Sequence, residues 1–152
     1  MATPPDVAEA EPAAVQLTIS GDQISVRNGL RALFDTFLVR RLAAADRGDV
    51  EIVLAEVLNN IVEHAYCSRS GDIDIALQLA PGALVCTITD TGAPMPPDGP
   101  PPGGLPDYTS IESLPEGGFG WHLIRAMSTD LRYSRANNCN RLEFRLPMTQ
   151  SP

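Results

Sequence analysis

Two adjacent segments near the middle of the chain constrain its fold most strongly. In "DIDIALQL" (72–79) a large apolar residue occupies every second position, in strict alternation with polar or small residues, and "ALVCTIT" (83–89) follows after Pro81-Gly82. Strict alternation places the apolar side chains on one face of a strand, and a short turn joins antiparallel neighbours. The pattern predicts a β-hairpin with one buried face, which a second layer of structure must cover.

Segments with helical periodicity can supply that layer. Apolar residues recur at helical spacing over 23–45, "DRGD" (46–49) is expected to end this helix, and a second helix is expected from about Val50 to Tyr66. Further elements are expected at 15–20 (strand), 118–127 (helix), and 130–135 and 141–146 (a last hairpin). The order of these elements predicts an α+β fold, a two-layer sandwich of helices against hairpin-connected strands.

The segment from 91 to 116 differs in kind from the rest of the chain. It contains eight prolines and no basic residue. Long segments without regular structure inside a compact domain are usually lids, binding loops or linkers. Residues 1–14 are expected to be a disordered N-terminal tail and 148–152 a C-terminal tail, so that a single domain covers 15–147.

Composition excludes several classes of protein. The formal net charge of -8 argues against a nucleic-acid-binding protein, and all 11 basic residues are arginine, which excludes a P-loop lysine. No signal peptide and no apolar run long enough to span a membrane is visible. The three cysteines form no CxxC pair. We therefore expect a cytoplasmic protein with reduced cysteines and no membrane partner.

The first candidate site lies in "AEVLNNIVEHAY" (55–66). Four residues separate Glu56 from Asn60, so on a helix they lie only about 40° apart and can face one pocket. A glutamate can act as a general base, and an asparagine oxygen is a suitable ligand for Mg²⁺. A solvated helix face would explain the same residues. Geometry does not favour His64 over Glu63 as a third member of the group.

Two further candidate sites contain glycine. In "TITDTGAP", Asp90 ends a strand and could accept a hydrogen bond from the exocyclic amine of a purine, while Gly92 would let the backbone approach the ring. An ordinary turn is the alternative. In "EGGFGWHLI", Gly117, Gly118 and Gly120 lead into a helix whose first N–H groups could bind phosphate. A flexible connector would explain these glycines equally well.

The three motifs occur in a specific order, as "EVLNNIVEHAY", "DTGAP" and "GGFGWHLIRAMSTDLRYSRANNCNRL". In this order the chain resembles the histidine-kinase-like (GHKL, Bergerat-fold) ATPases. Among them it is most similar to the stand-alone anti-sigma-factor serine kinases of bacterial partner-switching systems, and the resemblance covers about 15 to 147. It implies a mixed, mostly antiparallel sheet with helices on one face, and an ATP lid over 91–116.

The resemblance also implies a role for each motif residue. Glu56 would be the general base that activates the acceptor serine, and Asn60 would ligate the Mg²⁺ that bridges the phosphates of ATP. Asp90 would bind the adenine amine, with Gly92 beneath the ring. The remaining ATP-binding residues implied are Gly117, Gly118 and Gly120, at the lid hinge and the phosphates, and His64.

The function implied is that of an Mg-ATP-dependent serine/threonine kinase. It would phosphorylate a STAS-type anti-anti-sigma protein and otherwise sequester a sigma factor or an analogous regulator; a homodimer is compatible with the resemblance. Two features depart from the family: the lid has no basic residue, and Glu143 falls where relatives often have a small hydroxyl residue near the adenine. The alternative function is a nucleotide-dependent binding switch with weak or absent catalysis. A detached histidine-kinase domain is rejected because the only histidines, His64 and His122, lie inside the ATP motifs.

Overall fold

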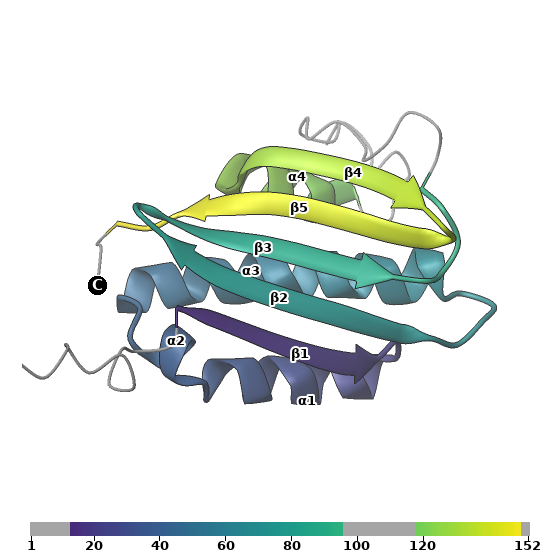
Figure 1. Ribbon diagram of the computed structural model, residues 1–152, viewed down its shortest axis with the longest axis horizontal. Helices are drawn as coiled ribbons and strands as arrows, with labels where there is room; N and C mark the ends of the chain where they lie inside the picture. The colour runs from purple at the N-terminus through teal and green to yellow at the C-terminus, as the bar shows by residue number, and fades with distance from the viewer. Residues whose placement is uncertain (1–12, 96–117, 150–152) are drawn as a thin grey trace, which may run out of the picture.

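The computed structural model describes residues 13–95 and 118–149, and their strands form one five-stranded sheet (Figure 1). The strands are β1 (Ala14–Ser20), β2 (Asp72–Ala80), β3 (Ala83–Asp90), β4 (Thr129–Ala136) and β5 (Cys139–Pro147). Their spatial order is β1-β2-β3-β5-β4, and every neighbouring pair is antiparallel. The two predicted hairpins are confirmed, and the second is inserted so that β5, not β4, lies beside β3. We expected a mixed, mostly antiparallel sheet; among the described strands no pair is parallel.

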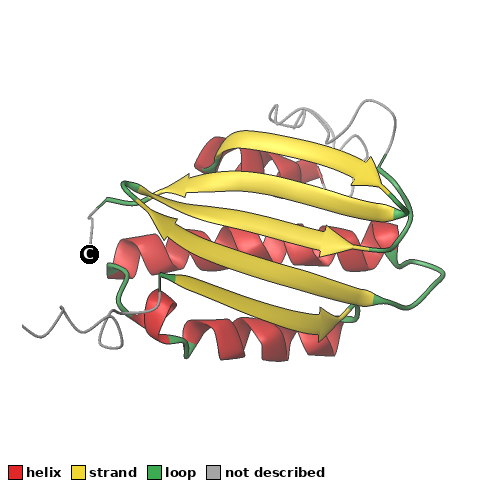
Figure 2. Cartoon of the chain, viewed as in Figure 1, coloured by secondary structure: helices red, strands yellow, loops and turns green. Residues whose placement is uncertain are grey.

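The helices lie on one face of this sheet, and no described helix or strand covers the other face (Figure 2). They are α1 (Gln23–Phe34), α2 (Phe37–Arg40), α3 (Ala44–Asn60), the π-helical turn η2 (Ile61–Ala65) and α4 (Gly118–Met127). The longest of them, α3, runs behind the middle of the sheet, with α1 and α4 on either side of it (Figure 1). The structure confirms the predicted α+β, two-layer α/β sandwich.

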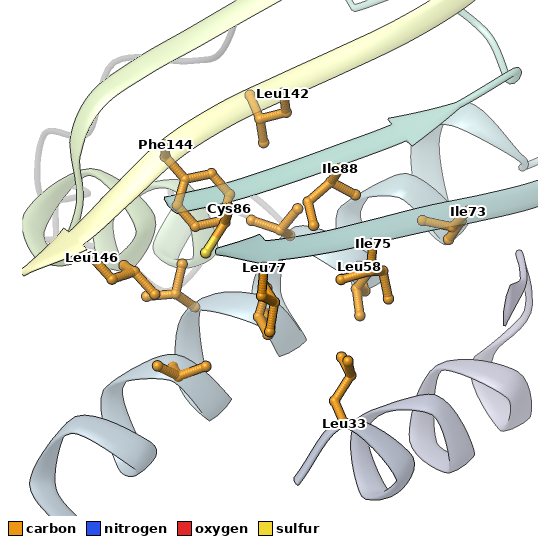
Figure 3. Close-up of a cluster of buried hydrophobic side chains, with 14 of the residues drawn as sticks. Leu33, Leu58, Ile73, Ile75, Leu77, Cys86, Ile88, Leu142, Phe144 and Leu146 are labelled. Carbon is orange, nitrogen blue, oxygen red and sulfur yellow. The ribbon is translucent and has the colours of Figure 1, made fainter. Parts of the chain in front are cut away.

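The hydrophobic core fills the space between the two layers. Alternate residues of β2, β3 and β5 point toward the helices, as Ile75, Ile88 and Phe144 do, and each of these is at most 1% exposed (Figure 3). Leu33 of α1 and Leu58 of α3 close the core from the other side. Each such side chain contributes about 1.5–3 kcal/mol by leaving water, so this packing fixes the position of α3 against the sheet.

The predicted boundary between the first two helices is wrong. Instead of one helix over 23–45 that ends at "DRGD", α1 ends at Phe34, and α3 begins at Ala44 and runs through 46–49. Asp46 is buried in the first turn of α3, where its charge suits the helix dipole, and it accepts hydrogen bonds from Thr149 at 3.1–3.2 Å. Gly48 costs about 1 kcal/mol in helix propensity, too little to end a helix packed into the core.

The ends of the domain differ slightly from the expected boundaries. Strand β1 begins at Ala14, inside the expected tail. Met148 is buried and Thr149 bonds to Asp46, although we expected both to belong to a C-terminal tail. Residues 1–12 and 96–117, which include most of the expected lid (91–116), lie outside the described residues. Within the part that is described, no helix is long and apolar enough to cross a membrane.

Candidate functional site

Glu56 and Asn60 lie together beneath the start of α4. Helix α3 is regular up to Asn60, so residues four apart project from the same side. A Cβ atom added to Gly120 would lie 2.6 Å from Oε2 of Glu56 and 3.7 Å from Nδ2 of Asn60. The first turn of α4 therefore lies beside both side chains, and any side chain at Gly120 would meet the Glu56 carboxylate.

Asn60 carries an unpaired polar group. The residue is only 8% exposed, and Nδ2 is the one fully buried side-chain nitrogen or oxygen in the described residues that has no hydrogen-bond partner. Such a group costs about 1–3 kcal/mol unless a ligand or water satisfies it. A half-turn about the Cβ–Cγ bond exchanges Nδ2 with Oδ1, so the position can present a donor to a phosphate or an oxygen to a cation.

An Mg²⁺ ion at this position would depend on the ligand that accompanies it. Within residues 13–95 and 118–149, no three His, Cys, Asp or Glu side chains gather as a metal-binding group. Mg²⁺ commonly binds through one or two protein oxygens and takes its other ligands from phosphates and water. The surroundings of Asn60 fit that mode of binding, and they do not fit a metal held by protein ligands alone.

The glycines of the third motif lie at the positive end of α4. Gly118 is the first residue of this ten-residue helix, and Gly120 follows in the same turn. The N–H groups of a first helical turn have no partner within the helix and attract anions. The structure thus brings Gly120 to Glu56 and Asn60, while Gly117 lies outside the described residues.

A second cluster forms at the end of β3. Asp90 is 6% exposed, and its Oδ1 accepts hydrogen bonds from the N–H of Gly92 and from Nδ2 of Asn140, both at 2.9 Å. Among the described residues nothing bonds to Oδ2. The carboxylate therefore keeps one oxygen that can accept a hydrogen bond from a ligand.

Asn140 was not predicted from the sequence. It lies opposite Asp90 in the β3–β5 register, yet the two are 50 residues apart in the chain. Its Oδ1 accepts from Tyr133 Oη at 2.5 Å and from Nη1 of Arg135 at 2.7 Å, and its Nδ2 also donates to the carbonyl of Ala93 at 2.8 Å. The local sequence carries no signal for this residue, because only the pairing of distant strands gives it a partner.

The structure gives a reason for glycine at position 92 that the motif did not reveal. A Cβ atom there would lie 2.5 Å from the carbonyl oxygen of Ala65 and 2.6 Å from its Cβ. The N–H of Ala93 donates to the same carbonyl at 2.9 Å. The absent side chain thus lets the segment after β3 pack against the π-helical end of α3, which joins the two clusters.

Two other residues singled out from the sequence lie away from the clusters. The His64 side chain is 67% exposed and its Nε2 is 3.9 Å from the carboxylate of Glu63, and no described contact joins it to Glu56 or Asn60. Glu143 pairs with Arg141 on the sheet face away from the helices. We expected Glu143 in the strand region near the adenine; its strand parity is opposite to that of Asn140, so its side chain lies on the other face of the sheet from Asp90.

The chain is similar to known proteins over most of its length. The family described as the histidine kinase-like ATPase domain matches residues 19–146. Serine-protein kinase RsbW of Halalkalibacterium halodurans is 30% identical over 119 residues, covering 74% of this chain and 62% of that protein. The corresponding protein of Bacillus thuringiensis is 30% identical over 100 residues, covering 57% of this chain and 56% of that protein. The chain thus spans about three-fifths of the length of these curated relatives.

Solved structures show the same fold. The RsbU and RsbW domains of a Mycobacterium tuberculosis protein superpose with a TM-score of 0.63 at 16% identity, covering 92% of this chain and 34% of that one. A blue-light activated histidine kinase of Erythrobacter litoralis gives a TM-score of 0.54 at 18% identity, covering 83% of this chain and 40% of that one. The match over 19–146 and the shared fold show that the chain belongs to the histidine kinase-like ATPase domain family.

Proposed function

We propose that this chain is an ATP-dependent serine kinase of the anti-sigma-factor type. The observation that carries the proposal is the buried, unpaired amide of Asn60, placed beside Glu56 and under the first turn of α4. A buried polar group without a partner indicates a ligand, and the neighbouring helix N-terminus favours an anion. The similarity to serine-protein kinases supports phosphoryl transfer as the reaction.

The phosphate end of the site would be built from α3 and α4. When bound, Mg²⁺ neutralises charge on the phosphates of ATP, and Asn60 would hold it through Oδ1. The first N–H groups of α4, those of Gly118 and Gly120 among them, would bind phosphate oxygens. Glu56 would accept the proton from the hydroxyl of the incoming serine as the serine oxygen attacks the γ-phosphorus, and ADP would leave with the electrons of the broken phosphorus–oxygen bond. Glu56 is partly exposed, so a substrate from solution can reach it.

The adenine end would lie at Asp90. Its free Oδ2 would accept a hydrogen bond from the 6-amino group, and the backbone at Gly92 would form one side of the base pocket. Ala65, which packs against Gly92, lies five residues after Asn60, at the end of η2. The two clusters are thus offset along α3 and η2, as the base and the phosphates of one nucleotide would require.

We propose a STAS-type anti-anti-sigma protein as the phosphate acceptor, and a sigma factor or an analogous regulator as the sequestered partner. The support is the family resemblance and the relatives' description as serine-protein kinases. His64 takes no part in this proposal, because no described contact joins it to either cluster.

The test is transfer of the γ-phosphate from Mg-ATP to STAS-domain proteins of the same organism. Glu56→Gln should reduce the transfer rate by at least about 100-fold and leave ATP binding intact, because it removes only the base. Glu63→Gln makes the same change on an exposed neighbour and should leave the rate unchanged. Asn60→Ala should weaken Mg-ATP binding itself. If the wild type neither binds Mg-ATP nor phosphorylates any such protein, the proposal fails.

One sequence feature favours a second candidate, a nucleotide-dependent binding switch without catalysis. The segment 91–116 has no basic residue to meet the transferred phosphate. In this case Mg-ATP would change affinity for the partner, and Glu56→Gln would change nothing. Phosphorylation of the partner that Glu56→Gln abolishes would exclude the switch.

A further inference from the structure

In the cluster around Asp90, the side-chain amide of Asn140 uses all of its hydrogen-bonding groups. Asn140 uses both amide hydrogens, toward Oδ1 of Asp90 and toward the carbonyl of Ala93, and its Oδ1 accepts from two donors, Tyr133 and Arg135. These partners fix the orientation of the Asn140 amide, because a flipped amide would place donor against donor and acceptor against acceptor. Asn140 is 5% exposed, so solvent offers no replacement partners.

This arrangement fixes the Asp90 carboxylate in turn. The outer torsion of an aspartate is broad and nearly two-fold, so a free carboxylate samples many angles. Two donors on one oxygen, the N–H of Gly92 and Nδ2 of Asn140, hold Oδ1 in place and leave Oδ2 without a partner among the described residues. The remaining oxygen is an acceptor held in a fixed direction before any ligand arrives, which reduces the cost of ordering on binding.

Arg135 and Tyr133 connect the same cluster to the segment that follows β3. Nη1 of Arg135 donates to the carbonyl of Gly92 at 3.0 Å as well as to Asn140, and the hydroxyl of Tyr133 accepts from the N–H of Met95 at 3.0 Å. Two residues of β4 therefore bond both to Asn140 of β5, which orients Asp90, and to the backbone beside the proposed base pocket.

We infer that Asn140, held by Arg135 and Tyr133, is a positioning residue that orients Asp90 to select nucleotides with a 6-amino group. This rests on the proposed function, in which Asp90 binds the adenine. A fixed acceptor increases the affinity for a purine that carries a donor at position 6, and it adds no affinity for a base that lacks one. Asn140 does not touch the ligand in this scheme; it acts through the Asp90 carboxylate.

The test compares two ligands by titration calorimetry on the full chain: Mg-ATP, and purine riboside triphosphate, which has hydrogen in place of the 6-amino group. The wild type should prefer ATP by at least about tenfold, the value of one hydrogen bond to a charged group. Asn140→Ala should reduce ATP affinity by about tenfold and leave the analogue nearly unaffected, because the analogue never used the oriented oxygen. The preference for ATP should therefore nearly vanish.

Two further variants keep the test decisive if Asn140→Ala fails to fold. Arg135→Met removes both Nη1 bonds from an exposed position and should lower the preference by about threefold, since Tyr133 still holds Asn140. Arg132→Met is the matched control, because Arg132 belongs to the same strand but has the opposite parity and is exposed. It should leave both affinities unchanged.

The outcomes separate this inference from the proposed function. Asn60→Ala should weaken both ligands by the same factor, because the phosphate end does not sense the base. If Asn140→Ala or Arg135→Met weakens both ligands equally, the role of Asn140 is structural and the inference is overturned while the nucleotide site stands. If the wild type prefers neither ligand, Asp90 does not read the amine and the inference is again overturned. If the wild type binds neither, both proposals fail.

Discussion

The contact between Gly120 and Glu56 allows catalysis to be separated from stability and from ligand binding by adding one methyl group. In Gly120→Ala the new Cβ would lie 2.6 Å from Oε2 of Glu56, whereas ordinary contact begins at 3.4 Å. The carboxylate must therefore retreat by about 0.8 Å. Asn60 is 3.7 Å away and need not move. A base displaced by close to 1 Å should slow phosphoryl transfer by about 100-fold.

The same substitution should not destabilise the fold. Glu56 is partly exposed, so its carboxylate can swing toward solvent at little cost, and alanine exceeds glycine in helix propensity by up to about 1 kcal/mol. Gly48→Ala is the matched control. Gly48 lies within α3, where an added Cβ would meet nothing within 4 Å, so the variant should gain up to about 1 kcal/mol of stability and keep its transfer rate.

Three measurements decide the matter for each variant: urea unfolding for stability, calorimetry for Mg-ATP affinity, and single-turnover transfer of labelled phosphate for the chemical step. We expect Gly120→Ala to keep its unfolding free energy and its affinity and to lose only the transfer rate. Transfer at the wild-type rate would refute the placement of Glu56 as the base beneath α4. A loss of stability of several kcal/mol would refute the claim that Glu56 can give way.

Three further predictions concern stability. Gly29→Ala should destabilise the domain by about 1–2 kcal/mol in urea unfolding, because its Cβ would lie 2.7 Å from Cγ2 of the stiff, buried Ile19. Asp46→Ala should cost about 1–2 kcal/mol in the same assay, since both donors of Thr149 lose their acceptor and the first turn of α3 loses a favourable charge. Hydrogen bonds at the start of α1 hold the pKa of Asp22 below its ordinary value of 3.8, so its carboxylate stabilises the fold above pH 3.8, and this contribution is lost as the pH falls through the lowered pKa. The stability difference between wild type and Asp22→Ala should therefore be constant near neutral pH and shrink in acid titrations monitored by circular dichroism.

Features that depend on neighbours in the chain were predictable from the sequence. Strict alternation identified β2, and Pro81-Gly82 marked the turn into β3. Helical spacing placed Glu56 and Asn60 on one side of α3, because that relation needs only a regular helix. These predictions hold because a local period determines which face of an element each side chain occupies.

Features that depend on distant contacts were missed, because a local period carries no information about them. Asp46 looked like part of a helix-breaking turn because its partner, Thr149, is 103 residues away. Asn140 looked like part of an ordinary turn because its relation to Asp90 exists only once β5 inserts beside β3. The position of Glu143 relative to Asp90 likewise follows from the β3–β5 register, which the sequence does not state.

The π-helical turn after Asn60 accounts for how one helix can serve both halves of the site. In η2 the N–H of Tyr66 bonds to a carbonyl five residues earlier, at 3.0 Å, and each extra residue in a turn rotates the remainder of the helix by about 100°. The end of the helix thereby turns toward the segment after β3, where the carbonyl of Ala65 accepts from Ala93 and the hydroxyl of Tyr66 accepts from the N–H of Thr91. Helical propensity carries no signal for such a turn, so it could not be predicted. These bonds tie the end of the helix to the sheet that carries the proposed adenine end. Asn60 lies only five residues before Ala65, so the same bonds also fix its position, and the protein alone sets the spacing between the two clusters.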